Sequence, residues 1–223
     1  MSRITPLSLG FANAILVQET GAIMIDTGAP ATPETYRQFF ARCAIDPQEI
    51  RLIVITHGHT DHFAHAHELR ELTGAPVLCH SKALTALRAA KNPPVHPRNE
   101  LGESVLRMIA GKEPPASQPL EPDILIDDEY DLAYYGIAGK VIPTPGHTDC
   151  SVSVVLDSGA VMVGDMIVSS PFTGQATIAY LAEQPELLFD NVRRLLSFGD
   201  LFYSGHGGPF SREQVRLALQ AEV

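Results

Sequence analysis

The chain has 223 residues, of which 45% are hydrophobic and 19% charged, an ordinary composition for a globular enzyme. Acidic residues outnumber basic ones by 26 to 16 and the formal net charge is -10, which disfavours a nucleic-acid partner because such binding needs basic patches. No apolar run approaches the roughly 20 residues of a membrane span, and the first residues lack the pattern of a signal peptide. We therefore expect no membrane contact and a cytoplasmic location.

Cysteine usage excludes two further classes. The chain has 3 cysteines, Cys43, Cys79 and Cys150, which are widely separated and form no Cys-x-x-Cys pair. An odd number at such spacing predicts neither a disulfide framework nor a thiolate metal site. All three are expected to be buried, reduced thiols.

The first part of the chain alternates strands with helices. Short apolar runs separated by turn residues predict a β-hairpin, and helical periodicity then alternates with two further strands. The expected elements are strands at 14–19 and 22–25, a helix at 33–42, a strand at 51–56, a helix at 63–72 and a strand at 76–79.

A proline-rich segment follows at 81–122. It contains two helical patterns, at 81–90 and around 101–110, and prolines frame the second of them. Because helices framed by prolines do not belong to a sheet, the segment is interpreted as an inserted helical flap. A role in a homodimer interface is the alternative for this flap.

The second part of the chain again alternates strands with helices. A capping box of Ser211 with Gln214 marks the start of the final helix. The other expected elements are strands at 124–126, 133–142, 151–156, 160–164 and 201–203, and a helix at 185–197.

The densest chemical signal is a run of three histidines and one aspartate directly after the strand at 51–56. It comprises His57, His59, Asp61 and His62. Imidazole and carboxylate suit Zn, Fe or Mn, and alternate residues of an extended loop can converge on one ion. Asp61 could instead cap the following helix, but capping would explain one residue and leave three histidines unexplained. The run therefore predicts metal binding.

Three more candidate ligands each follow an apolar strand in a glycine-containing loop. They are His147, Asp165 and His206. Each taken alone has a simpler interpretation: the histidines could be ordinary loop residues and Asp165 a helix cap. Their shared position after strands places them where open α/β sheets put their sites, and this favours convergence with the first run.

These motifs resemble the metallo-β-lactamase superfamily across nearly the whole chain. The resemblance rests on Asp26-Thr27-Gly28, on His57-x-His59-x-Asp61-His62, and on His147, Asp165 and His206 in the same order. It implies one α/β domain over 1–223, a four-layer αβ/βα metallo-β-lactamase sandwich with the flap inserted, and a dinuclear site at one edge. His57, His59 and His147 would hold one metal and Asp61, His62 and His206 the other, with Asp165 bridging and Asp26 orienting a ligand histidine.

The implied chemistry is hydrolysis. Two divalent ions, zinc with iron or manganese as alternatives, would activate a bridging hydroxide against a carbonyl of a small-molecule substrate. Asp61 would assist by accepting a proton. Glyoxalase II-like relatives look most similar. Glyoxalase II itself resembles this domain with an added C-terminal helical domain that binds glutathione, whereas here only 211–223 follows the last ligand, so a small ester, thioester or lactone is expected in place of a glutathione thioester. Phe172 and Tyr180 are candidate substrate contacts.

Two other functions are compatible with the resemblance. A persulfide dioxygenase would share the fold but bind a single iron through the first histidine set, and would consume oxygen. A non-catalytic binding module would retain only the fold, although buried imidazoles and carboxylates without a metal cost stability. The complete ligand set favours the hydrolase.

Overall fold

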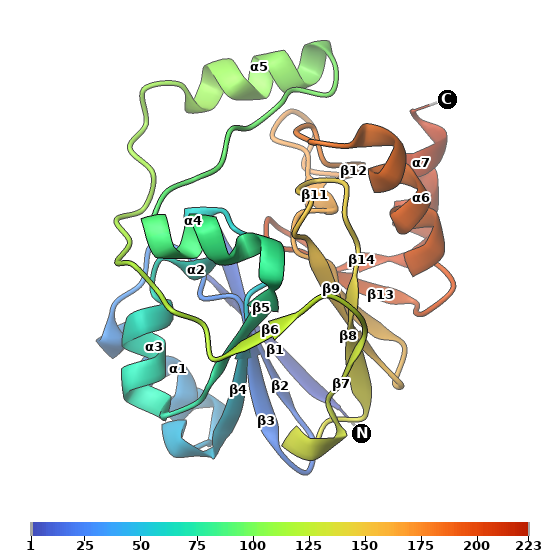
Figure 1. Ribbon diagram of the computed structural model, residues 1–223. Coiled ribbons are helices and arrows are strands. Elements are labelled where there is room, and N and C mark those ends of the chain that lie inside the picture. Colours follow the sequence, from blue (N-terminus) through green and yellow to red (C-terminus); the bar gives the residue numbers. More distant parts are fainter. Residues whose placement is uncertain (1, 223) are drawn as a thin grey trace.

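Two six-stranded β-sheets form the centre of the molecule (Figure 1). The computed structural model describes residues 2–222. In the first sheet the strands follow chain order; β1 to β3 pair antiparallel and β3 to β6 pair parallel. Its strands are β1 (Arg3–Ser8), β2 (Asn13–Gln18), β3 (Ala22–Ile25), β4 (Ile50–Val54), β5 (Val77–His80) and β6 (Ile124–Ile126).

The second sheet has the order β14-β13-β10-β9-β8-β7. β10 and β13 pair in parallel, and the other neighbours are antiparallel. A separate two-stranded hairpin, formed by β11 (Ile167–Ser169) and β12 (Ala176–Ile178), comes between β10 and β13 in the chain. The strands of the second sheet are β7 (Tyr130–Asp131), β8 (Gly139–Pro143), β9 (Val152–Leu156), β10 (Ala160–Met162), β13 (Leu201–Tyr203) and β14 (Phe210–Ser211).

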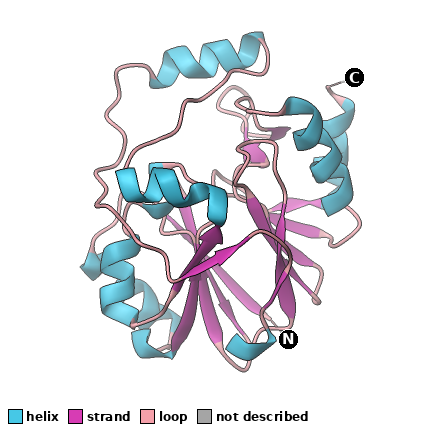
Figure 2. Ribbon diagram, in the orientation of Figure 1, coloured by secondary structure: helices cyan, strands magenta, loops and turns pink. Residues whose placement is uncertain are grey.

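Helices cover the outer face of each sheet (Figure 2). Buried residues of α1 and α3 share one hydrophobic cluster with the first sheet, and those of α6 and α7 share another with the second. The order helix, sheet, sheet, helix confirms the predicted four-layer sandwich. The covering helices are α1 (Pro33–Cys43), α3 (Ala66–Thr73), α6 (Pro185–Leu195) and α7 (Arg212–Gln220).

The strands that carry the candidate ligands are buried on both faces. Ile23 and Leu52 pack between the two sheets, whereas Met24 and Ile53 pack beneath the helices. Successive side chains of a strand point to opposite faces, so a strand covered on both sides is apolar at every position. This explains the uninterrupted apolar runs, which end in polar residues only where β3 and β4 leave the sheet.

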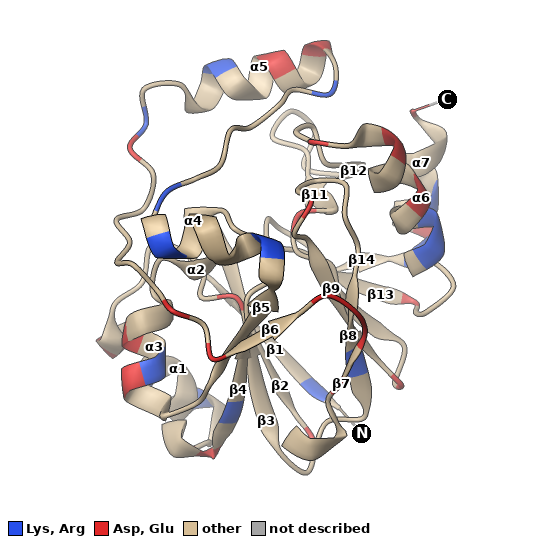
Figure 3. Cartoon of the chain, in the orientation of Figure 1, with Lys and Arg blue, Asp and Glu red and all other residues tan. Residues whose placement is uncertain are grey.

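The remaining helices lie outside both sheets. α4 (Leu84–Ala89) and α5 (Glu100–Ile109) belong to the segment 81–122, and α5 stands apart at the top of Figure 1. Charges of both signs are spread over helices and loops (Figure 3). Within residues 2–222 no helix has the length and apolarity to cross a membrane. The short helices are α2 (Thr60–Phe63), η1 (Pro47–Glu49), η2 (Ser81–Ala83) and η3 (Ala133–Tyr135).

Helix starts follow the local sequence. The capping box of α7 is confirmed: the Ser211 side chain accepts from the backbone of Gln214, and the Gln214 side chain accepts from the backbone of Ser211. Such a reciprocal pair satisfies two backbone donors that a helix leaves free. In the same way Thr32 and Thr35 cap α1, with a proline at its first position. The predicted burial of all three cysteines is confirmed as well.

Three expectations about strands were wrong. The strand expected at 133–142 is a 3-10 turn followed by β8, because Gly136 adopts φ 75 and interrupts the extended chain. β6 was placed in the second part but pairs with β5 of the first sheet, across the whole inserted segment. β1 was missed because polar residues and Pro6 mask it, although proline is tolerated in a strand at the edge of a sheet.

Candidate metal centre

All seven predicted ligands meet at one edge of the two sheets. His57 and His59 follow β4, while Asp61 and His62 lie in α2, which begins directly after them. His147, Asp165 and His206 follow β8, β10 and β13 of the second sheet. The structure brings them together in two groups, within each of which the potential ligand atoms lie within 4.8 Å of one another: His57, His59, His147 and Asp165; and Asp61, His62 and His206.

In the first group three imidazoles point at a common centre. Nδ1 of His59 lies 3.0 Å from Nε2 of His57 and 3.1 Å from Nε2 of His147. Oδ2 of Asp165 is 3.8 Å from Nε2 of His57 and 3.7 Å from Nε2 of His147. Three nitrogens and one oxygen at these spacings are the donor set of a four-coordinate zinc or iron site.

The second group faces the same carboxylate from the other side. Nε2 of His206 is 3.1 Å from both Asp61 Oδ2 and Asp165 Oδ2. Nε2 of His62 is 3.6 Å from Asp61 Oδ2 and 3.3 Å from Asp165 Oδ1. Asp165 therefore lies between the two groups, with an oxygen within reach of each.

Backbone carbonyls fix which nitrogen of two histidines faces the centre. Nδ1 of His147 donates to the carbonyl of Leu181 at 2.8 Å, and Nδ1 of His206 donates to the carbonyl of Phe11 at 2.7 Å. A carbonyl only accepts, so the proton of the neutral ring is on Nδ1 and the lone pair is on Nε2. Both histidines are thus oriented as ligands.

Asp26 holds the base of the site. Its carboxylate accepts from the backbone N–H of Thr56 at 2.7 Å, from the Thr56 hydroxyl at 2.7 Å, and from Nδ1 of His62 at 2.8 Å. The Thr56 hydroxyl is also 3.1 Å from Nδ1 of His57, so Asp26 positions ligands of both groups. Its backbone is in the left-handed region, with φ 54, which costs energy that these bonds offset.

Charge separates the histidines into two kinds. Burial lowers the pKa of His59 to about 3 and that of His57 well below its usual value, so both rings are neutral. Burial would also lower the pKa of His206, but the carboxylates of Asp165 and Asp61 raise it to about 10. Burial would raise the pKa of Asp61, yet His62 and His206 lower it to about 2. The carboxylates around the second group therefore favour positive charge at its histidines, and a bound cation would supply that charge.

Two buried atoms at the centre are left without a hydrogen bond among the described residues. Nε2 of His62 and Oδ1 of Asp165 are both inaccessible and, although close to each other, do not have hydrogen-bond geometry. An unpaired buried polar atom costs about 1–3 kcal/mol. A divalent cation would satisfy both, so the residues present fit a metal centre of imidazole and carboxylate ligands.

Gly205 leaves room for two of the ligand side chains, because a Cβ at this position would overlap Oδ1 of Asp165 and Cε1 of His62. We expect Gly205→Ala to displace both side chains and weaken metal binding roughly 10- to 100-fold, the range for residues that position ligands. Gly74→Ala, in open space with φ +71, is the control: it should cost about 1–2 kcal/mol of backbone strain and leave metal affinity unchanged. Metal titration of both variants measures this, and wild-type affinity in Gly205→Ala would contradict it.

A cavity of about 690 Å³ opens onto the centre. Ligands of both groups line it, as does Tyr180, whose hydroxyl bonds Ser170 at 2.8 Å. Phe172 lies next to this wall with its ring against Tyr180, and its side chain is largely exposed. The structure thus places Tyr180 at the cavity and Phe172 at its outer margin.

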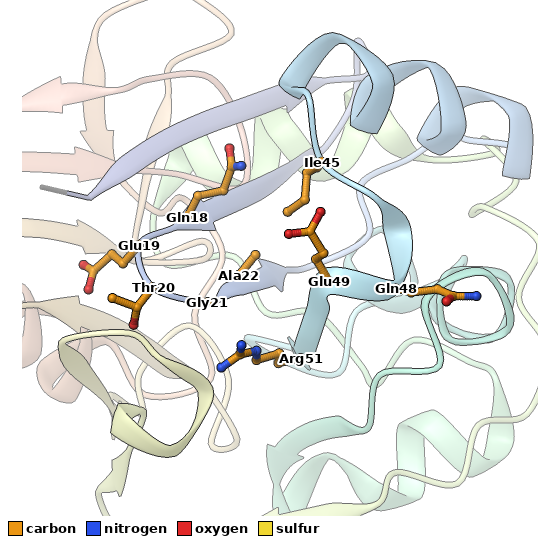
Figure 4. A pocket seen from close by; sticks show the side chains of 9 residues that line it. All are labelled: Gln18, Glu19, Thr20, Gly21, Ala22, Ile45, Gln48, Glu49 and Arg51. Carbon is orange, nitrogen blue, oxygen red and sulfur yellow. The ribbon is translucent and has the colours of Figure 1, made fainter.

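A second, smaller cavity of about 310 Å³ lies at the opposite ends of β3 and β4 (Figure 4). Its lining includes Gln18, Glu49 and Arg51. Among the described residues around it there is no histidine or cysteine, and the candidate ligands are at the other ends of the same strands. The larger cavity is therefore the candidate active site.

Sequence reasoning missed three functional groups. Thr56 was treated only as the end of a strand, although its place beside the histidine run was a usable signal. The carbonyls of Phe11 and Leu181 had no such signal, because every residue has a carbonyl and only the fold decides which ones meet a histidine.

The chain belongs to the metallo-β-lactamase superfamily: residues 7–173 match the family described as Metallo-beta-lactamase superfamily. It is 24% identical to the probable metallo-hydrolase YflN of Bacillus subtilis, over 96% of this chain and 87% of the relative. It is 28% identical to Metallo-beta-lactamase domain-containing protein 1 of Homo sapiens, over 99% of this chain and 71% of the relative. The fold and the ligand pattern thus define an enzyme of this superfamily.

Solved structures show the same fold. BLEG-1 B3 metallo-beta-lactamase matches with a TM-score of 0.69 and 21% identity, covering 96% of this chain and 95% of that one. TTHA1623 in a di-iron-bound form matches with a TM-score of 0.65 and 24% identity, covering 94% of this chain and 96% of that one. At this low sequence identity, the similarity shows a shared fold.

Proposed function

We propose that the protein is a dinuclear metal-dependent hydrolase of a small ester, thioester or lactone, similar to glyoxalase II in its ligand set. One observation carries the proposal: Asp165 lies between two complete groups of ligands, with an oxygen 3.1 Å from His206 and 3.7 Å from His147. A carboxylate shared in this way is suited to hold two cations close together.

The ligand assignment follows the two groups. His57, His59 and His147 would bind one ion, Asp61, His62 and His206 the other, and Asp165 both. We propose zinc, with iron or manganese as alternatives; the di-iron form of TTHA1623 supports keeping iron among them. Two such ions supply polarisation of a carbonyl oxygen and activation of water at neutral pH.

Asp61 is the proposed catalytic residue. Its carboxylate is ionised, since its pKa is lowered to about 2, and it lines the cavity in which a substrate would bind. A carboxylate of such low pKa is a weak base but a good hydrogen-bond acceptor. We infer that Asp61 orients the attacking water by accepting a hydrogen bond from it rather than by keeping its proton.

Tyr180 is the proposed substrate contact. It lies in the cavity wall next to Leu181, whose carbonyl orients His147. Its hydroxyl contacts Ser170, and its ring contacts Phe172 at 5.8 Å between centroids. Phe172 would act through Tyr180 by supporting this wall.

A persulfide dioxygenase remains the competing proposal, with one iron on the first group. The intact second group argues against it, because Asp61, His62 and His206 would then form a buried, charged cluster without an ion. Such clusters are costly to retain.

The test combines two assays on protein loaded with zinc, iron or manganese. Hydrolysis of an ester, thioester and lactone panel is followed by acid release, and oxygen consumption is followed with glutathione persulfide. We expect turnover of at least one carbonyl class and no oxygen uptake. Oxygen uptake without hydrolysis would replace the hydrolase by the dioxygenase.

A further inference from the structure

Apolar side chains gather above the metal centre. Helix α5 carries Leu101, Val105, Met108 and Ile109 on one face, at the spacing of successive helical turns. Met108 is 48% exposed and Leu101 49%, so part of this apolar face is in contact with solvent. The C-terminal half of this face has a defined place in the structure, because Val105, Met108 and Ile109 line the large cavity.

The cavity connects this helix to the candidate ligands. Its lining contains the candidate ligands His59, Asp61, His147, Asp165 and His206. The rest of the lining is formed mainly by aliphatic and aromatic residues and prolines, among them Phe11, Pro30, Val95, Val105, Met108 and Ile109. The volume of about 690 Å³ is within the range of pockets that enclose a small organic ligand. A molecule whose carbonyl lies at the ligands would therefore extend along apolar surface.

Ionic groups have few partners in this cavity. Apart from the candidate ligands, the charged residues among the described lining are Lys112 and Glu113, a neighbouring pair of opposite sign. A substrate tail with several charges, such as a glutathionyl group with two carboxylates and an ammonium, would be desolvated without compensation. A neutral hydrocarbon chain would instead gain from leaving water.

The fold holds α5 over the cavity through its N-terminal end. Arg98, 6% exposed, makes two hydrogen bonds to Glu222, at 2.8 and 2.6 Å, and one to the carbonyl of Ala179 at 2.9 Å. Gly102 packs so tightly that a Cβ would lie 2.5 Å from the carbonyl oxygen of Tyr180. The helix is thus tied to the segment that orients His147 through Leu181, and its apolar face is a built wall of the site.

We propose that the substrate carries an apolar acyl group that packs between α5 and Phe11 while its carbonyl lies at the metal centre. This rests on the proposed hydrolase function and narrows its substrate to acyl esters, acyl thioesters or alkyl-substituted lactones. Phe11 is suited to the wall next to the ligands, because it lines the cavity, its ring meets the His206 ring edge to face at 5.2 Å between centroids, and its side chain is exposed.

The first test is a chain-length series. For acetyl, butanoyl, hexanoyl and octanoyl thioesters with the metal-loaded protein, kcat/KM should rise about two- to fourfold per methylene, the range between half and full burial of each group. Met108→Ser should flatten this rise for the longer chains. Leu101→Ser is the matched control, since it alters an equally exposed residue of the same helix that lies outside the described cavity lining.

The second test does not depend on turnover. Calorimetric binding of acetate, butanoate, hexanoate and octanoate to the metal-loaded protein should show the same rise in affinity, again reduced by Met108→Ser and kept by Leu101→Ser. Chain-length-dependent binding without hydrolysis of any carbonyl class would support the acyl pocket and contradict the hydrolase.

Two results would overturn the acyl pocket. Hydrolysis and binding that do not vary with chain length would reject it and leave the hydrolase standing. An equal loss in Met108→Ser and Leu101→Ser would show that the effect comes from disturbance of the helix, and would reject the assigned wall.

Discussion

Replacement of His59 by alanine is expected to remove most of the bound metal and to reduce hydrolysis by at least about 10³-fold, because a metal ion supplies several kcal/mol of transition-state stabilisation. His59 is the residue on which the first group converges, with its Nδ1 3.0 and 3.1 Å from the two other imidazoles. The fold should survive, since the hydrophobic clusters lie between and outside the sheets rather than at this edge.

His67→Ala is the matched control. His67 lies in α3, outside both ligand groups, beside Glu71 at the surface. It should bind metal and turn over substrate as the wild type does. Metal analysis after dialysis, kcat/KM and circular dichroism of both variants decide the matter; a His59→Ala protein that keeps its metal and its activity would refute the assignment of this residue.

The second large effect is expected for Asp26→Asn. Asparagine tolerates the left-handed backbone at this position, so the backbone is not the cause. The amide has one acceptor oxygen where the carboxylate has two, and at least one of the three donors from Thr56 and His62 loses its partner. We expect a loss of about 1–3 kcal/mol in unfolding free energy and roughly 10- to 100-fold weaker metal binding.

Thermal unfolding and metal titration measure these two losses separately. At about 2–4 °C per kcal/mol for a chain of this size, the melting temperature should fall by several degrees. Asp157→Asn is the control, because Asp157 is an exposed aspartate between β9 and β10 and its replacement removes the same charge away from the site. It should change neither the melting temperature nor the metal affinity. Unchanged metal affinity in Asp26→Asn would show that Asp26 supports only the fold.

The layers of the fold could be predicted because burial requires apolar residues at regular positions in the sequence. Strands covered on both faces, such as β4, must be apolar throughout, and the covering helices show periodic apolar positions. Edge strands have no such constraint. β1 and β14 are short or polar, which is why neither was predicted. The pairing of β6 with β5 could not be predicted, because the long insertion between them hides their adjacency.

The candidate ligands could be predicted for a similar reason. Most of the seven histidines and aspartates lie in loops that follow buried strands, where open sheets place their sites, and all seven occur in the order of the family motifs. Their orientation could not be predicted. It depends on the carbonyls of Phe11 and Leu181, which come from loops distant in the chain from the histidines they meet. The apolar wall supplied by α5 likewise became visible only when its position over the centre was known.

Elemental analysis of the metal-loaded protein, joined to anomalous diffraction from the same protein, tests whether the site binds two ions. We expect two ions per chain at saturation, one among His57, His59 and His147, the other among Asp61, His62 and His206, with Asp165 in contact with both. A single ion confined to the first group, or ions bound elsewhere while Asp165 contacts neither, would contradict this expectation.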